Sequence, residues 1–152
     1  MRPAVVSSEY LPNAITGLLC AQTPDEAKTF YWQLENHVVV QGQTFEVAEH
    51  LVPVLVAALL EEDLPTFVRF SLFNLLFQIV AYEPSHVEIE LGNGRLTNRC
   101  QTLAREGLWT FYQIYLNGSD AESESAYDIL EKIETDAERL EAFRSARTSR
   151  PE

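Results

Sequence analysis

Two histidines and two glutamates fall close together in the stretch NHVVVQGQTFEVAEHLVPVLVAALLEED, which spans residues 36–63. Imidazole nitrogens and carboxylate oxygens bind zinc, and the same groups carry protons in general acid–base catalysis. Glu46 and His50 are four residues apart, a spacing that puts two side chains on one face of a helix. With His37 and Glu49 they form a candidate metal or catalytic site.

The rest of the sequence gives this chemistry little support. Zinc requires three or four ligands in tetrahedral reach, and the stretch contains no paired-histidine metalloprotease motif and no cysteine. Cys20 and Cys100 fit no metal or redox spacing. The chain has neither a nucleophile elbow nor a phosphate-binding loop. We therefore expect no catalytic residues, no metal and no cofactor, and keep a small metal-dependent enzyme using His37, Glu46 and His50 as an alternative.

The distribution of charge indicates a protein partner instead. Of the formal net charge of −12, nine acids and two bases in residues 1–64 give −7, and ten acids and five bases in residues 120–152 give −5. The four acids and four bases in residues 65–119 cancel. Such a chain repels nucleic acid and anionic lipid, and it attracts a basic partner. Solubility alone would also account for the charge.

Length and composition indicate one globular domain. The 152 residues can bury a core, and a hydrophobic share of 46% is ordinary for a globular protein. We see no signal peptide and no apolar run near the roughly 18 residues of a membrane span. Two isolated cysteines suit a reducing compartment. We expect a single helical-repeat domain over residues 1–147, a flexible tail over 148–152, and a cytoplasmic location.

The elements that must position these side chains are predicted to be helices almost throughout. Three capping boxes, in which Ser or Thr precedes Glu by three residues, predict helix starts at Thr23, Ser119 and Thr135. Apolar periodicity extends the prediction along the chain. The predicted helices cover residues 8–20, 24–38, 46–61, 65–82, 95–116, 120–133 and 136–147. The segment 83–96 is predicted to be the one long loop, because Val87, Ile89 and Leu91 alternate with acids and Gly92 and Gly94 mark a turn.

The predicted helix 65–82 is apolar nearly all round, which indicates a central helix covered on several sides. Ser71, Asn74 and Gln78 form a narrow polar stripe on it, within about 60° of one another at 100° per residue. An unpaired buried amide costs about 1–3 kcal/mol. The stripe must therefore meet water, a groove or a buried network.

An internal repeat links two segments, VPVLVAALLEEDLPTFVRFSLFNLLFQI (52–79) and LWTFYQIYLNGSDAESESAYDILEKI (108–133). Each reads as a helix, a short acidic turn and a second helix, and such pairs bury their apolar faces by stacking. With the Val52-Pro53-x-Leu55 start, the turn at Asp63 and Pro65, and Arg69 early in the second helix, the chain resembles HEAT-like repeat proteins. The second copy has Trp109 in place of Pro53 and Ser123 in place of Arg69, which leaves the repeat count open.

The resemblance implies an all-α fold, a short right-handed α-α superhelix of antiparallel helix pairs. It also implies a helix start near Ala48–Val52, because proline belongs in a first turn. Glu46 and Glu49 then lie at a helix N-terminus, which favours acids, and His50 faces solvent. Small proteins of this kind are similar to bacterial immunity proteins that neutralise a toxin.

We therefore expect a non-enzymatic protein-binding module, most concretely an immunity protein that occludes a toxin with a basic surface; a general scaffold or adaptor is the alternative. The expected partner-binding residues are Glu35, Glu46, Glu49, Glu61, Glu62, Asp63, Tyr31, Trp32 and Gln43, with Ser71, Asn74 and Gln78 lining the same groove. For Trp32 the alternative is packing against the next helix pair. Asp63 is also expected to cap the following helix, with Pro65 close behind. The cluster Trp109, Phe111, Tyr112 and Tyr115 is expected to be mostly core.

Overall fold

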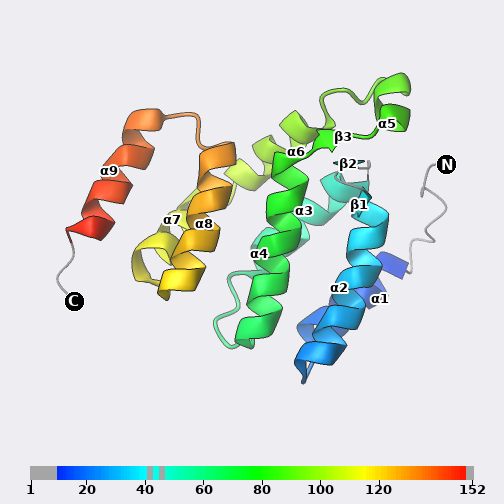
Figure 1. Cartoon of the computed structure of the whole chain (residues 1–152), viewed down its shortest axis with the longest axis horizontal. Helices are drawn as coiled ribbons and strands as arrows, with labels where there is room; N and C mark the ends of the chain where they lie inside the picture. The colour runs from blue at the N-terminus through cyan, green and yellow to red at the C-terminus, as the bar shows by residue number, and fades with distance from the viewer. Residues whose placement is uncertain (1–9, 41–42, 45–46, 150–152) are drawn as a thin grey trace.

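The computed structural model describes residues 10–40, 43–44 and 47–149, and within them the fold is all-α (Figure 1). The helices of this part are α1 (Tyr10–Leu19), α2 (Pro24–Val38), α3 (Val47–Ala58), α4 (Thr66–Ala81), α5 (His86–Glu90), α6 (Leu96–Arg105), α7 (Leu108–Asn117), α8 (Asp120–Ile133) and α9 (Ala137–Thr148). None of these helices has the length and apolar character needed to cross a lipid bilayer.

The helices lie in two layers (Figure 1). In one layer α4 lies between α2 and α8 and packs against both. In the layer behind, α1 packs against α2, α3 against α4 and α6, and α7 against α8. The last helix, α9, packs on α7. This arrangement makes α4 the central element, as its nearly continuous apolar sequence predicted.

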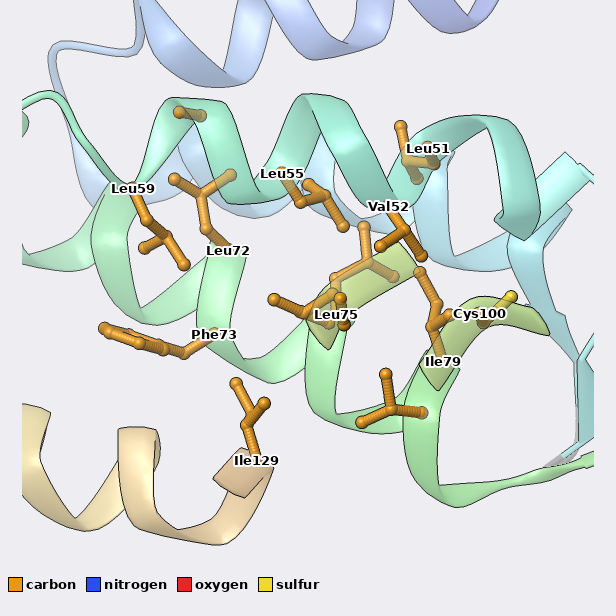
Figure 2. Packing of buried hydrophobic residues seen from close by; sticks show 14 of the residues in the cluster. Leu51, Val52, Leu55, Leu59, Leu72, Phe73, Leu75, Ile79, Cys100 and Ile129 are labelled. Carbon is orange, nitrogen blue, oxygen red and sulfur yellow. The ribbon is translucent and has the colours of Figure 1, made fainter. Parts of the chain in front are cut away.

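The core lies between the layers. Leu72, Leu75 and Ile79 of α4 are completely buried, and Figure 2 shows them directed toward Leu55 of α3 and its neighbours. On another side of the same helix, Phe73 lies toward Ile129 of α8 (Figure 2). Fully burying one such side chain contributes about 1.5–3 kcal/mol. Of the predicted aromatic cluster, Phe111, Tyr112 and Tyr115 are buried, whereas Trp109 is 61% exposed.

Two of the three predicted helix starts carry the expected cap. Thr23 accepts the backbone N–H of Glu26 at 3.2 Å, and Ser119 forms a complete capping box with Glu122. The third prediction is wrong by one residue, because Asp136 rather than Thr135 caps α9. The backbone N–H of Asp136 donates to Glu134 at 2.9 Å, which holds Asp136 in the capping position.

Two expectations around α3 and α4 are also corrected. The helix α3 begins at Val47, so Pro53 lies in its interior rather than in its first turn. Pro53 is exposed, and on that side water can solvate the carbonyl oxygen that the missing N–H leaves without a helical donor. Asp63 does not cap α4, because the helix starts at Thr66 with Pro65 as its N-cap residue and without a side-chain cap.

The predicted helix 95–116 is two helices, α6 and α7, which meet at Gly107. Gly107 lies at the break, where α3 approaches closely: a Cβ atom on Gly107 would lie 2.4 Å from Cγ1 of Val56. No periodicity within the segment carries that information, because the contact depends on a helix about 50 residues away in sequence. The prediction of a single helix was therefore wrong.

The predicted loop 83–96 contains regular structure. Glu83–Pro84 forms strand β3, which pairs in parallel with β2 (Gln43–Thr44), and β2 pairs antiparallel with β1 (Val39–Val40). Helix α5 follows, capped by the Ser85 side chain, which accepts the Glu88 N–H at 3.1 Å. The extended interpretation of Val87 to Leu91 was wrong, because residues 86–90 form this short helix, in which Glu88 is buried and Ile89 is exposed.

Polar and aromatic contacts attach α9, in which none of the residues is buried. The Tyr112 hydroxyl donates to Glu134 at 2.6 Å, and Arg139 donates to the same carboxylate through two bonds of 2.7 Å. Phe143 stacks on Tyr112 with ring centroids 3.9 Å apart. Arg147 donates to Asp120 at 3.0 Å. Helix α9 ends at Thr148, the first residue of the expected tail.

Candidate functional site

The polar stripe of α4 meets α2 at Tyr31. The side-chain amides of Asn74 and Gln78 donate to the Tyr31 hydroxyl oxygen at 2.9 Å and 2.6 Å, and Ser71 donates to the carbonyl oxygen of Phe67 at 3.0 Å. Burial, and then the neighbouring carboxylate of Glu35, raise the pKa of Tyr31 far above its ordinary value. Two members of the stripe therefore belong to a network that joins α2 to α4.

A hollow of about 390 Å³ lies over this network, between α2 and α4. Its lining residues are Pro24, Ala27, Lys28, Tyr31, Trp32, Phe67, Phe70, Ser71 and Asn74. Trp32 is 56% exposed at this hollow rather than packed between helix pairs. The Lys28 amino group lies 5.9 Å from the centre of the Trp32 ring. The structure thus brings together four of the predicted residues: Tyr31, Trp32, Ser71 and Asn74.

A second hollow of about 320 Å³ lies on the other side of α4, against α8. Its lining residues are Phe70, Phe73, Asn74, Phe77, Ser125 and Asp128. Phe70 and Asn74 line both hollows, so the two lie next to each other across α4. We call the residues that line these two hollows the front face, since α2, α4 and α8 form the front layer in Figure 1.

The α8 side of the front face was missed by sequence reasoning. Glu124, Asp128 and Glu131 are exposed on α8, and Asp128 lines the second hollow. Their spacing of four and then three residues places the carboxylates on one helical face. That spacing within a predicted helix was the available signal.

The predicted acids do not gather on the front face. Glu61, Glu62 and Asp63 are exposed in the turn that joins α3 to α4. Glu49 lies at the other end of α3, where its carboxylate accepts from Arg99 of α6 at 3.2 Å. Of the acids in the predicted set, Glu35 is the one placed beside Tyr31.

Two predicted residues cannot be placed in this way: Glu46 lies outside the described residues, and Gln43 is described through its backbone pairing with Val40 and Glu83.

The metal candidates are distributed over two helices. His37 is half-buried in the last turn of α2, and burial lowers its pKa. His50 is exposed on α3. Among the residues that the structure describes, no three His, Cys, Asp or Glu side chains are grouped as metal ligands.

A third hollow, of about 420 Å³, contains Arg69 between the α3–α4 turn and the ends of α7 and α8. Arg69 donates to Glu122 at 2.7 Å and to the carbonyl oxygens of Leu59 and Glu61 at 3.3 Å and 3.0 Å. Glu62 lines the same hollow. Through these bonds the Arg69 guanidinium joins α4 to α8 and to the end of α3.

The fold and the front face define an all-α protein with an exposed aromatic surface. No protein-family model matches the chain, and neither a characterised protein nor a solved structure matches it significantly. The function is therefore inferred from the geometry of the described residues.

Proposed function

We propose that this chain is a non-enzymatic protein-binding module, most concretely an immunity protein that neutralises a toxin by covering a basic surface on it. The observation that carries the proposal is Trp32, which is 56% exposed beside an aromatic hollow. Tryptophan and tyrosine are enriched among the residues that dominate binding energy in protein interfaces. An exposed aromatic patch rimmed by polar groups is typical of an interaction site.

The proposed architecture is a short right-handed stack of HEAT-like helix pairs, formed by α1/α2, α3/α4 and α7/α8. The position of α4 between α2 and α8 supports it. The contacts of Arg69 support it as well, because they link one proposed pair to the next. Stacking of this kind produces an extended surface from equivalent helices, which suits the binding of another macromolecule.

The proposed mechanism is steric occlusion with electrostatic steering. The net charge of −12 attracts a basic partner, and Glu61, Glu62 and Asp63 present exposed charge at the α3–α4 turn. Steering acts over about one Debye length, roughly 8–10 Å at physiological ionic strength. Association should therefore slow steeply as salt rises, whereas the dissociation rate should change little.

Co-expression with the product of the neighbouring gene tests the immunity function. Restored growth in the presence of a toxic product supports it. Complex formation without protection identifies a scaffold or adaptor instead, and the absence of both overturns the proposal.

Two single variants refine this test. Trp32→Ala should weaken the complex at least tenfold, and Trp109→Ala, at an exposed tryptophan on α7, is the matched control. Equal losses in both would contradict the assignment to Trp32.

Charge reversal at the α3–α4 turn tests the steering. Glu61→Lys combined with Glu62→Lys should slow association without changing the unfolding midpoint, because both residues are exposed. The control reverses two other exposed acids, Glu90→Lys and Glu106→Lys, and changes the net charge equally. If both pairs slow association to the same degree, net charge rather than the turn does the steering.

A further inference from the structure

Across the front face, α4 presents half-buried aromatic side chains to solvent. Phe70 lines both hollows, and Phe67 and Phe77 line one each. Asn74 also lines both hollows. Its side-chain amide is held in place by the hydrogen bond to Tyr31. Two adjacent hollows that share Phe70 and Asn74 suit a row of apolar side chains from one segment better than they suit a single compact molecule.

The charge of the surrounding helices selects the occupant. Between them α2, α4 and α8 carry eight acids and three bases, a net of −5. Two of the acids are paired: Glu122 with Arg69, and Asp120 with Arg147 of α9. The carboxylates of Glu124, Asp128 and Glu131 are exposed along one face of α8. Asp128 lines the second hollow, and Glu124 lines a neighbouring hollow on the α9 side of the helix. This surface repels polyanions such as nucleic acid and anionic membranes.

The length of the acidic row matches a helical partner. Seven residues of helix span about 10 Å at 1.5 Å per residue. A partner helix laid along α8 presents Lys or Arg at the same spacing of three and four residues, and its apolar side then faces α4. Recognition of an amphipathic helix by a groove uses anchors at this spacing.

We propose that the front face binds a cationic amphipathic helix of a partner protein, with apolar side chains on either side of Phe70 and with Lys or Arg side chains on Glu124, Asp128 and Glu131. This inference rests on the proposed protein-binding function. It adds the chemistry of the bound segment and moves the electrostatic contact from the N-terminal acids to α8.

A displayed library of random 16-residue peptides, selected on the whole chain, tests the proposal without knowledge of the natural partner. The enriched peptides should be positively charged, with apolar and basic residues at helical spacing. A synthetic copy of the most enriched peptide then serves as the probe in a fluorescence-polarisation titration. No enrichment, or enrichment of neutral or acidic sequences, overturns the proposal.

Variants locate the binding site of that peptide. Asp128→Lys with Glu131→Lys should weaken it at least tenfold, and Glu90→Lys with Glu106→Lys is the control of equal charge change. Phe70→Ser should also weaken binding, with circular dichroism to confirm folding. Asp128 and Glu131 are exposed, so replacing them should leave the fold intact. The proposal therefore stays testable even if Phe70→Ser unfolds the protein. Equal weakening by the two lysine pairs overturns the proposal.

The two proposals fail separately. If co-expression shows a partner complex that Asp128→Lys with Glu131→Lys leaves intact, the front-face inference is wrong and protein binding stands. If peptides bind the front face but no partner complex forms in cells, the cationic-helix site stands and the immunity function is wrong.

Discussion

The guanidinium of Arg69 on α4 lies 2.7 Å from the carboxylate of Glu122 on α8, although 53 residues separate them in sequence. Nη1 of the same side chain donates to the carbonyl oxygens of Leu59 and Glu61, just beyond the end of α3. Carbonyl groups at a helix C-terminus have no helical donors. One side chain therefore satisfies the end of α3 and joins the two helices that border the second hollow.

Replacing Arg69 should destabilise the protein without changing its secondary structure. We expect Arg69→Met to lower the free energy of unfolding by about 2 kcal/mol, because a hydrogen bond to a charged group contributes about 1.5–3 kcal/mol. The measurement is urea denaturation followed by circular dichroism. Arg144→Met is the control, since the Arg144–Glu141 pair is more than half exposed on both sides and should contribute little. Equal effects would show that Arg69 does not hold the helices together.

The close approach of α3 should make position 107 intolerant of a side chain. Gly107→Ala should cost about 1–3 kcal/mol, because the added methyl group would overlap Val56. Val56→Ala should recover part of that loss in the double variant, and a thermodynamic cycle measures the recovery. The control is Gly94→Ala, where a Cβ atom would meet nothing within 4 Å. Additive losses in the double variant would refute the steric explanation.

The pH dependence of stability should contain a contribution from Glu134. Its side chain is fully buried, and its bonds to Arg139, followed by the one to Tyr112, lower its pKa from 4.5 to about 2. A carboxylate with a lowered folded-state pKa stabilises the protein fully above the unfolded value, and this stabilisation is lost as the pH falls toward the folded value.

The difference in unfolding free energy between wild type and Glu134→Gln should therefore be largest near pH 7 and should shrink between pH 4.5 and about pH 2. Denaturant titrations at pH 7, 4.5 and 3 measure this difference. Glu138→Gln, at an exposed residue of α9, is the control. A difference that stays constant over this range would contradict the role of Glu134.

Two tyrosines should resist ionisation while the protein remains folded. Burial is the main cause that raises the pKa of Tyr31 and Tyr112, and the nearby carboxylates of Glu35 and Glu134 add to it. Their protonated forms are favoured in the folded state, so this stabilisation is complete below the ordinary pKa of about 10 and is lost as the pH rises above it.

Absorbance at the tyrosinate band should therefore show Tyr31 and Tyr112 titrating only together with alkaline unfolding. Comparing wild type with Tyr31→Phe and Tyr112→Phe assigns the two signals. Normal titration of either tyrosine in folded protein would contradict the prediction for that residue.

The sequence predicted most helices because their signals are local. Thr23 and Ser119 cap the helices that follow them, and the apolar character of 65–82 identified the central element. The errors arose where distant contacts decide the local structure. Gly107 lies at the break between α6 and α7, where Val56 of α3 approaches it closely, and the strands are defined by pairing between residues 43–44 and 83–84.

The candidate site was also predicted where the signals are local and missed where distant contacts decide. Residue type alone identified Trp32 as an interface candidate and the stripe on α4 as polar atoms that need partners. The hydroxyl of Tyr31 as the acceptor for Asn74 and Gln78 follows only from the packing of α2 on α4. The acidic row on α8 was visible in the spacing of Glu124, Asp128 and Glu131, but the position of Asp128 at the same hollow as Phe70 required the fold.

The way in which α9 is attached has a consequence for the native ensemble. Its contacts include a stacked ring pair, ion pairs near its two ends and the packing of Leu140 and Phe143 on the core, but none of its residues is buried. Local opening of this helix exposes far less apolar surface than global unfolding, so its amides should exchange with deuterium well before those of α4. Partial melting of the chain should therefore begin at α9 and leave the front face assembled.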